Sequence, residues 1–304
     1  MGKHSFTHTV FMKTRMKSLF FLLTATAFAC NGCQTPPAQE NTSSHENSAD
    51  NSFFPLDEIL SDEPFTDDFK QEDTRPESDD VWNVDDVDIS AIDKNRKLIS
   101  FTFDDAPTRY LENIFAVFAS FNEDNPDCKA SATYFFNGRL FDNENFSFLH
   151  SAIAMGFELG NHTYSHFDLT SLTDDALQSE IQRVDDILQR ADGKPYHLLR
   201  APYGKINDTV KNTAPAPLID WTIDTVDWTG VSADNIYNTV MENCFSGAIV
   251  LFHDGYPHTI EALKRLLPDL KDKGYQIVSV SQMAKTHGCT LRKGKVYIRA
   301  RKQA

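Results

Sequence analysis

The amino-acid sequence predicts an α/β fold with parallel strands, arranged either as a layered sheet or as a barrel. Three observations support this class. From Lys94 onward, short apolar runs alternate with longer segments in which apolar residues recur at helical spacing. About 210 residues remain from that point, which is enough to bury one core. Ionisable residues follow five of the predicted strands, at the edge where parallel sheets collect their chemistry.

The clearest predicted helix covers residues 174–191. Its apolar side chains recur every three or four positions, two aspartates favour its N-terminus, and Gly193 ends the pattern. The segment 259–273 closes on Gly274 in the same way. The predicted strands are 98–103, 132–136, 157–159, 197–199, 218–222, 248–252 and 276–280. The predicted helical segments are 110–121, 146–155, 174–191 and 259–273.

Residues 1–33 are typical of an export signal. Three basic residues between positions 13 and 17 precede an apolar run of about a dozen residues, too short to span a bilayer comfortably. Cys30 follows Ala27-Phe28-Ala29, which resembles the lipobox of bacterial lipoproteins, and Cys33 is a second candidate. A lipid anchor to the membrane through Cys30 and ordinary signal cleavage both stay open. We expect an exported protein of the cell envelope, either a membrane-anchored lipoprotein or a secreted protein.

The acidity of the chain belongs to residues 34–93. The whole sequence has a formal net charge of −15, and this stretch carries 18 acidic and two basic residues. Its few large apolar side chains cannot offset the entropy of ordering, so we expect a disordered linker that holds the domain at 94–289 away from a surface. The last segment, 290–304, has six basic and no acidic residues. It predicts a solvated basic tail, with binding to an anionic wall polymer as the alternative.

His162 and His166 are candidate metal ligands. Residues four apart lie on one face of a helical turn, so both imidazoles can reach one ion, and imidazole is a common zinc ligand. The apolar stretch at 156–160 predicts a strand that leads into the pair. Asp105 is the third candidate, because a carboxylate beside two imidazoles leaves an open position for water. An aspartate pair after a strand also suits a turn or a helix cap.

The other polar candidates suit proton transfer. Asp104 is the candidate general base, and Arg200 can orient it and keep it ionised, although an arginine there also suits a surface ion pair. His253 is the candidate general acid, with Asp227 fixing its tautomer and raising its pKa. Tyr203 lies in a Pro-Tyr-Gly turn that offers a backbone N–H to a developing oxyanion, or is merely a loop.

Five ordered motifs resemble a known family. They are TFDDAP (102–107), HTYSH (162–166), RAPYG (200–204), DTVDW (224–228) and LFH (251–253). Together they resemble the motifs of the NodB-type polysaccharide deacetylases, carbohydrate esterase family four, over residues 98 to about 283. The resemblance implies a distorted (β/α) barrel, a zinc-type divalent ion (Co²⁺ or Ni²⁺ being alternatives) and hydrolysis of N- or O-acetyl groups from a glycan.

The resemblance also implies individual roles. Asp104 would be the base and His253 the acid, and the metal ligands would be Asp105, His162 and His166. Arg200 would support the base, and Asp227 would support the acid. Tyr203 would donate its main-chain N–H to the oxyanion. Ala106 stands where the family usually has glycine, so its methyl group is expected to narrow backbone approach at the rim of the site. The expected pocket residues are Trp228, Trp221, Pro202 and Leu251, although large aromatics in such folds more often serve packing.

The expected substrate is an N-acetylglucosamine-type glycan such as peptidoglycan or chitin oligomers. An acetylxylan O-acetyl esterase is the alternative enzyme. A non-catalytic glycan-binding lipoprotein is the third possibility, and it predicts that a ligand, the base or the acid is missing. We expect an acetylated glycan as partner, no nucleic acid, and a monomer. Cys128, Cys244 and Cys289 allow at most one disulfide, and the pairing stays open.

Overall fold

The structure is a computed structural model that describes residues 80–141 and 146–301. The chain divides into two units, 1–70 and 71–304, and every described residue lies in the second. The predicted export signal, Cys30, Cys33 and most of the acidic linker therefore fall outside the described residues. Within the described ranges, no helix is both long enough and apolar enough to cross a membrane.

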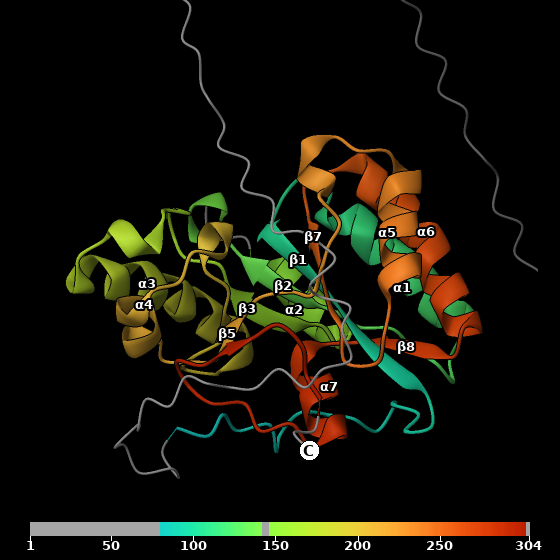
Figure 1. Ribbon diagram of the computed structural model, residues 1–304, viewed down its shortest axis with the longest axis horizontal. Helices are drawn as coiled ribbons and strands as arrows, with labels where there is room; N and C mark the ends of the chain where they lie inside the picture. The colour runs from blue at the N-terminus through green and yellow to red at the C-terminus, as the bar shows by residue number, and fades with distance from the viewer. Residues whose placement is uncertain (1–79, 142–145, 302–304) are drawn as a thin grey trace, which may run out of the picture. The chain divides into compact units, whose positions relative to one another are not determined.

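In the part of the chain that the structure describes, nine strands form one sheet, and all pairings between these strands are parallel (Figure 1). The sheet runs in the order β6-β7-β1-β2-β3-β4-β5-β9, and β8 pairs with β1 beside this path. This curled parallel sheet with helices outside it confirms the predicted distorted (β/α) barrel. The strands are β1 (Lys97–Ala106), β2 (Thr133–Phe136), β3 (Glu158–Asn161), β4 (Leu198–Leu199), β5 (Leu218–Ile219), β6 (Ile223–Asp224), β7 (Ile249–His253), β8 (Tyr275–Val278) and β9 (Val296–Tyr297).

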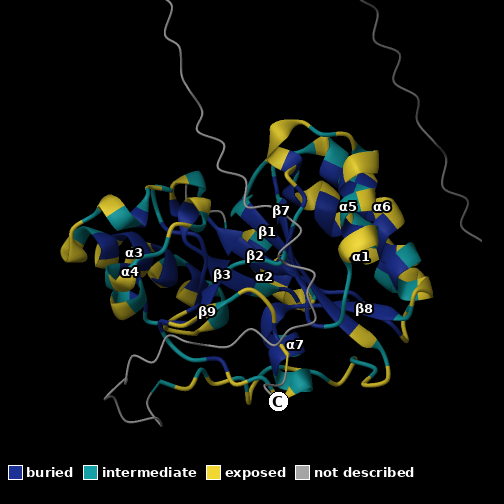
Figure 2. Ribbon diagram, in the orientation of Figure 1, coloured by how far each residue is buried: buried dark blue, intermediate teal, exposed yellow. Residues whose placement is uncertain are grey.

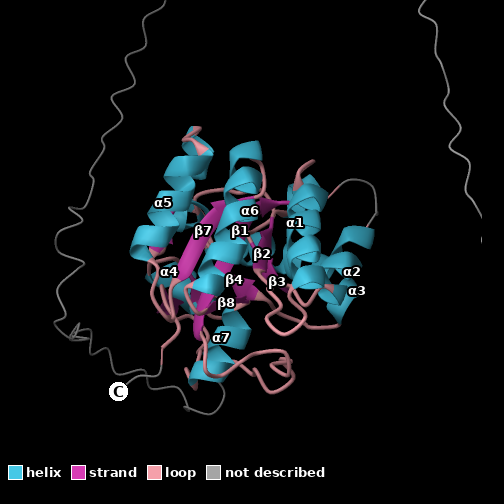
Figure 3. Ribbon diagram, turned by 90° about the vertical axis from the view of Figure 1, so that its right-hand side faces the viewer, coloured by secondary structure: helices cyan, strands magenta, loops and turns pink. Residues whose placement is uncertain are grey.

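In Figure 3, α5, α6 and α1 lie side by side in front of the strands, with α2 and α3 at the right and α7 below. The helices as a group cover the sheet. They form where the predicted helical spacing places apolar residues toward the sheet, and their outer faces are exposed (Figure 2). The helices are α1 (Leu111–Asp124), α2 (Ser147–Ala154), α3 (Asp174–Asp192), α4 (Asp208–Thr213), α5 (Ala233–Asn243), α6 (Pro257–Asp272) and α7 (Val280–His287).

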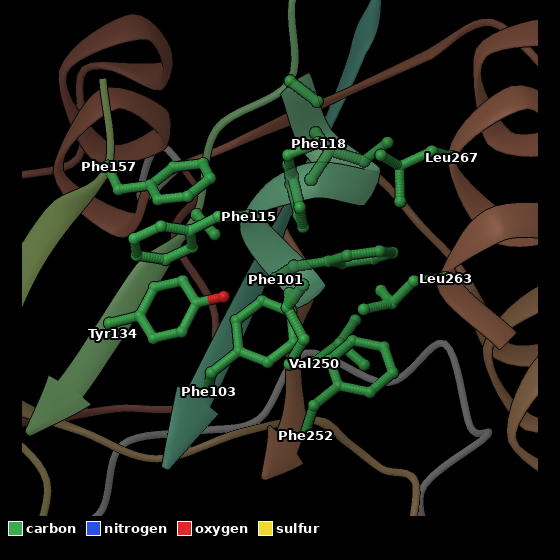
Figure 4. Packing of buried hydrophobic residues seen from close by; sticks show 14 of the residues in the cluster. Phe101, Phe103, Phe115, Phe118, Tyr134, Phe157, Val250, Phe252, Leu263 and Leu267 are labelled. Atoms are coloured by element: carbon green, nitrogen blue, oxygen red, sulfur yellow. The ribbon is translucent and has the colours of Figure 1, made fainter. Parts of the chain in front are cut away.

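The long central strand β1 separates the core from the site. Phe101 and Phe103 point into the main apolar cluster, where they meet side chains of α1 and α6 (Figure 4). Because side chains alternate along a strand, Thr102 and Asp104 lie on the opposite face of β1. Both are buried there, and both contact the guanidinium of Arg200. Alternate side chains of β1 therefore serve two purposes: one face packs in the core, and the other face presents polar groups to the site.

Two segments differ from the elements expected from sequence. Only the first two residues of the run 218–222 are strand, as β5, and the separate strand β6 begins after the run at Ile223. The run 276–280 ends as strand β8 at Val278, because Ser279 begins α7 with a capping box. The short helix α4 and the helix α5, which carry narrow apolar faces, were not expected from the sequence pattern.

Both ends of the described part contact the domain. The basic segment expected as a solvated tail contains β9, which pairs with β5, and the buried Ala300. Its apolar side chains complete a small cluster at one end of the sheet, so residues 291–301 belong to the fold rather than to solvent. On the other side, Trp82 donates its backbone N–H to Leu291 and packs on the same cluster. The last residues of the predicted linker are thus held at the domain.

The cysteines of the described residues are unpaired. Cys128 is buried, whereas Cys244 and Cys289 are partly exposed. Burial raises the pKa of Cys128 and of Cys289, which keeps both as thiols. The structure therefore shows no disulfide among these three residues.

Candidate active site

The three candidate ligands come together at the carboxyl ends of β1 and β3. The His166 Nε2 lies 3.4 Å from Asp105 Oδ1, and His162 Nε2 lies 3.8 Å from the same oxygen. One potential ligand atom from each of the three lies within 4.8 Å of the others. Two ligands of a tetrahedral zinc ion, each about 2.1 Å from the metal, stand roughly 3.4 Å apart. The donor set and its spacing therefore fit a divalent ion of the zinc type.

The histidine pair does not lie on a helix, contrary to the sequence-based expectation. Residues 162–166 form an irregular loop in which Thr163 and His166 adopt left-handed backbone conformations, with φ of 65° and 58°. The loop folds back so that both rings face Asp105. Spacing alone could not reveal this, because the left-handed conformation depends on hydrogen bonds from distant residues.

Hydrogen bonds fix the orientation of both imidazoles. His162 Nδ1 lies 2.8 Å from the carbonyl oxygen of Arg200, so it carries the proton and leaves Nε2 free to bind a metal. His166 Nδ1 lies 3.3 Å from the Tyr203 hydroxyl. Burial, together with the neighbouring His162, lowers the pKa of His166. This lowered pKa favours the neutral form of His166, which is the form that coordinates metals.

Asp104 is held ionised inside the barrel. Its Oδ1 accepts a hydrogen bond of 2.8 Å from Arg200, whose guanidinium is fully buried and also donates to Thr102. Burial by itself would raise the pKa of Asp104, but the charge of Arg200, with those of His162 and His253, holds that pKa below its usual value. Arg200 therefore does not form a surface ion pair but neutralises the buried carboxylate of Asp104. The second oxygen of that carboxylate, Oδ2, lies 3.6 Å from His162 Nε2.

His253 lies beside Asp104, because β7 and β1 pair with these two residues in register. Its Nδ1 is 2.7 Å from Asp227 Oδ1. The other oxygen of Asp227 accepts from the His253 backbone and from the hydroxyl of Thr259. Burial alone would lower the pKa of His253, but the hydrogen bond and charge of Asp227 raise it above its usual value. The imidazole therefore keeps its proton into more alkaline solution.

Tyr203 lies in the short turn Pro202–Gly204 after β4, again with a left-handed φ of 62°. Its side chain is 65% exposed. Its backbone N–H makes no hydrogen bond to any of residues 80–141 or 146–301, so it is available to a ligand. Gly204 allows the turn to pack on Trp221, since a β-carbon there would stand 3.1 Å from the indole.

The expected pocket residues are not equally placed. Trp228 is 55% exposed near the acid, at the 3-10 turn that contains Asp227. Trp221 is partly buried against the small cluster at one end of the sheet, which includes Leu291 and Ala300, and its ring lies 5.6 Å from the Arg200 guanidinium. Pro202 and Leu251 are buried. The methyl group of Ala106 packs into the main core cluster, which argues against the expected narrowing of the site rim.

Two supporting residues were not anticipated from the sequence. Thr102 receives a hydrogen bond from Arg200, and Thr259 donates one to Asp227. Thr102 lies two residues before the base, so strand alternation was a usable signal for it. Thr259 lies at the start of α6, outside the five motifs, and nothing in the local sequence marks it.

The sheet, the Asp105–His162–His166 cluster and the neighbouring Asp104 and His253 fit a hydrolase of the (β/α)-barrel class. Residues 91–216 match the polysaccharide deacetylase family. The chain is also 34% identical over 200 residues to a peptidoglycan-N-acetylglucosamine deacetylase of Bacillus cereus, covering 63% of this chain and 70% of that protein. The protein belongs to the polysaccharide deacetylase family.

Two further relatives show the range of this family. A bifunctional xylanase/deacetylase of Pseudobutyrivibrio xylanivorans is 28% identical over 198 residues, covering 63% of this chain and 32% of that protein. The solved structure of the peptidoglycan deacetylase PdaC from Bacillus subtilis superimposes with a TM-score of 0.59 at 31% identity, covering 64% of this chain and 93% of that structure. Asp227 and His253 lie beyond the matched range 91–216.

Proposed function

We propose that the protein is a metal-dependent deacetylase that removes acetyl groups from an N-acetylglucosamine-type glycan of the cell wall, such as peptidoglycan or chitin oligomers. One observation carries the proposal: a buried, ionised Asp104 and a proton-bearing His253 lie in register on neighbouring strands beside the Asp105–His162–His166 triad. The relatives named as peptidoglycan deacetylases support the choice of glycan. A non-catalytic glycan-binding protein would lack one of these groups, and all of them are present.

The triad residues Asp105, His162 and His166 would hold the metal. We favour Zn²⁺ because two imidazoles and one carboxylate are a common catalytic zinc set, and Co²⁺ and Ni²⁺ suit the same ligands. When bound, the ion supplies Lewis acidity that polarises the acetyl carbonyl and acidifies water.

The chain's own residues then move the protons. Asp104 accepts a proton from the attacking water at Oδ2, since its Oδ1 is bonded to Arg200. The water oxygen bonds to the acetyl carbon, and the Tyr203 backbone N–H donates to the carbonyl oxygen as negative charge develops there. His253 donates its Nε2 proton to the leaving nitrogen, because its Nδ1 is bonded to Asp227. The C–N bond breaks, and acetate and a free amine remain.

An acetylxylan O-acetyl esterase is the alternative, because the same groups would cleave an ester and one relative is a xylanase/deacetylase. A substrate panel separates the two. Acetate release should be measured from peptidoglycan, N-acetylated chitin oligomers and acetylated xylan oligomers at equal acetyl concentration. The proposal expects the N-acetylated glycans to be the better substrates. Preference for acetylxylan would establish the alternative, and no release from any of the three would overturn both.

We infer that the enzyme works in the cell envelope, as a monomer. The predicted export signal and the named function of the peptidoglycan deacetylase relatives support this location. The protein is either retained at the membrane by a lipid anchor on Cys30 or secreted into the medium. Cys30→Ala should shift the protein from the membrane fraction to the medium if the anchor exists, and change nothing if the protein is secreted.

A further inference from the structure

The loop that carries both histidines needs support, because its backbone is strained. Thr163 and His166 adopt left-handed conformations that residues other than glycine rarely take. Such conformations persist only where the surroundings fix them. The question is which side chains do so, since a relaxed loop would turn the two rings away from Asp105.

Asn161, the last residue of β3, makes the first connection. It is fully buried, and its Oδ1 accepts the Thr163 backbone N–H at 2.9 Å. Its Nδ2 donates to the Ile181 carbonyl at 2.9 Å and to Asp185 Oδ1 at 3.0 Å. The side chain can accept from Thr163 only while the amide is held in this orientation. Both of its donor bonds go to α3, so α3 determines that orientation.

Asp185 is the second connection. Its carboxylate is fully buried, and the same Oδ1 also lies 2.9 Å from His197 Nδ1. The opposite ring nitrogen of His197 lies 3.3 Å from Asp192 Oδ1. Burial alone would lower the pKa of His197, but the two carboxylates raise it. A buried, charge-assisted network thus leads from the C-terminal part of α3 to the backbone of the ligand loop.

We propose that Asp185 is a positioning residue for metal binding, acting through Asn161 on the loop that presents His162 and His166. This inference rests on the proposed function, because it requires that the triad bind a divalent ion. Residues that orient metal ligands from behind typically change metal affinity about 10- to 100-fold when they are removed. The effect of Asp185 should be of that size, although it touches neither the ion nor the substrate.

The test compares three variants of the full chain by zinc affinity, measured by competition with a chromophoric chelator. Asp185→Ala should bind zinc about 10- to 100-fold more weakly than the parent. Asp185→Asn keeps an Oδ1 that can accept from both partners, so its zinc affinity should stay close to that of the parent. Asp186→Ala is the matched control: it lies on the same helix, and its carboxylate bonds Gln182 at the surface. Unchanged zinc affinity in Asp185→Ala would overturn the inference.

Thermal unfolding distinguishes a role of Asp185 in positioning the metal ligands from a role in stabilising the fold as a whole. Zinc raises Tm by an amount that reflects binding to the folded state. A merely structural role for Asp185 would lower Tm equally with and without zinc, whereas a positioning role shrinks the rise that zinc produces. An undiminished rise in Asp185→Ala therefore also overturns the inference. If the parent itself binds neither zinc, cobalt nor nickel, the proposed metal-dependent function fails instead.

A second pair of variants covers the case in which Asp185→Ala does not fold. Asn161→Asp keeps the acceptor for the Thr163 N–H but places a second carboxylate beside that of Asp185. The two negative charges repel, so the variant should bind zinc more weakly. Adding Asp185→Asn restores a donor to that contact, so the double variant should recover part of the affinity. A double variant as weak as, or weaker than, Asn161→Asp would contradict the proposed connection between the two residues.

Discussion

The site residues lie on two kinds of backbone, the ends of paired strands and irregular loops. Asp104 and His253 occupy the ends of neighbouring strands, where parallel pairing fixes their separation, and each has a buried charged partner. His166 and Tyr203 lie in loops with left-handed φ, and their places depend on hydrogen bonds and ring contacts across loops. Sheet geometry thus places Asp104 and His253, whereas contacts between loops place His166 and Tyr203.

This difference predicts the effect of replacing each kind of residue. Replacing a strand-borne group should remove its chemistry and leave the metal triad in place, since β1 and β7 stay paired. Replacing a loop-borne ligand should remove both the metal and the activity, because only two of the three proposed ligands would remain.

The largest effect is expected for His162→Ala. Loss of one of three ligands should abolish stoichiometric zinc binding and reduce deacetylation to the background rate. Elemental analysis of the purified variant, together with acetate release, checks both consequences. One full equivalent of zinc with activity intact would show that His162 is not a ligand.

Asp104→Asn tests a strand-borne group. The amide cannot accept the proton from water, so kcat/KM should fall by about 10²–10⁴-fold, the usual contribution of a positioned base. Bound zinc should remain at the parent level, because Asp104 lies outside the triad. Turnover at the parent rate would exclude Asp104 as the base.

Asp227→Asn should move the alkaline limb of the pH profile. His253 acts in its protonated form, so activity is lost as the pH rises through its pKa, and Asp227 raises that pKa. Without the carboxylate the pKa falls, and the alkaline limb should shift to lower pH while the acidic limb stays in place. A pH profile of kcat/KM measures this, and an unshifted alkaline limb would contradict the role of His253 as acid.

The smallest effect concerns the two tryptophans. Trp228→Ala removes an exposed ring and should raise KM by about two- to tenfold with Tm unchanged, if the ring stacks on the glycan. Trp221→Ala should instead lower Tm, because that ring packs on the small cluster at one end of the sheet and supports the turn at Gly204. Equal KM for Trp228→Ala and the parent would remove Trp228 from the pocket.

Much of the fold follows from the sequence because apolar periodicity is strong in its central elements. The stripe on α3 and the buried run of β1 could be predicted almost to the residue. The strand β9 could not, since its two residues lie among basic side chains and their pairing with β5 depends on tertiary contact. The end of β8 was misplaced because Val280 continues the apolar run while Ser279 already caps α7.

The candidate site divides in the same way. Strand ends predicted where Asp104, Asp105 and His253 would meet, because parallel strands end at one edge. The conformation of the histidine loop was predicted wrongly as a helical turn. The Thr163 N–H is bonded to Asn161, which in turn is bonded to Asp185 on α3. The contact between Asn161 and Asp185 joins residues 24 positions apart, and no local pattern encodes it.

The pairing of β9 with β5 has a consequence for how the chain is made. Among the strands of residues 80–141 and 146–301, β9 comes last in chain order, so this edge of β5 remains unpaired until residues 296–297 have been synthesised. An exposed strand edge is a site for association between chains. A chain that stops after residue 289 would keep this edge permanently open and lose Leu291 and Ala300 from the small cluster at one end of the sheet. Such a chain should elute as oligomers or aggregate in size-exclusion chromatography, whereas a monomeric elution would show that β9 is dispensable for closing the sheet.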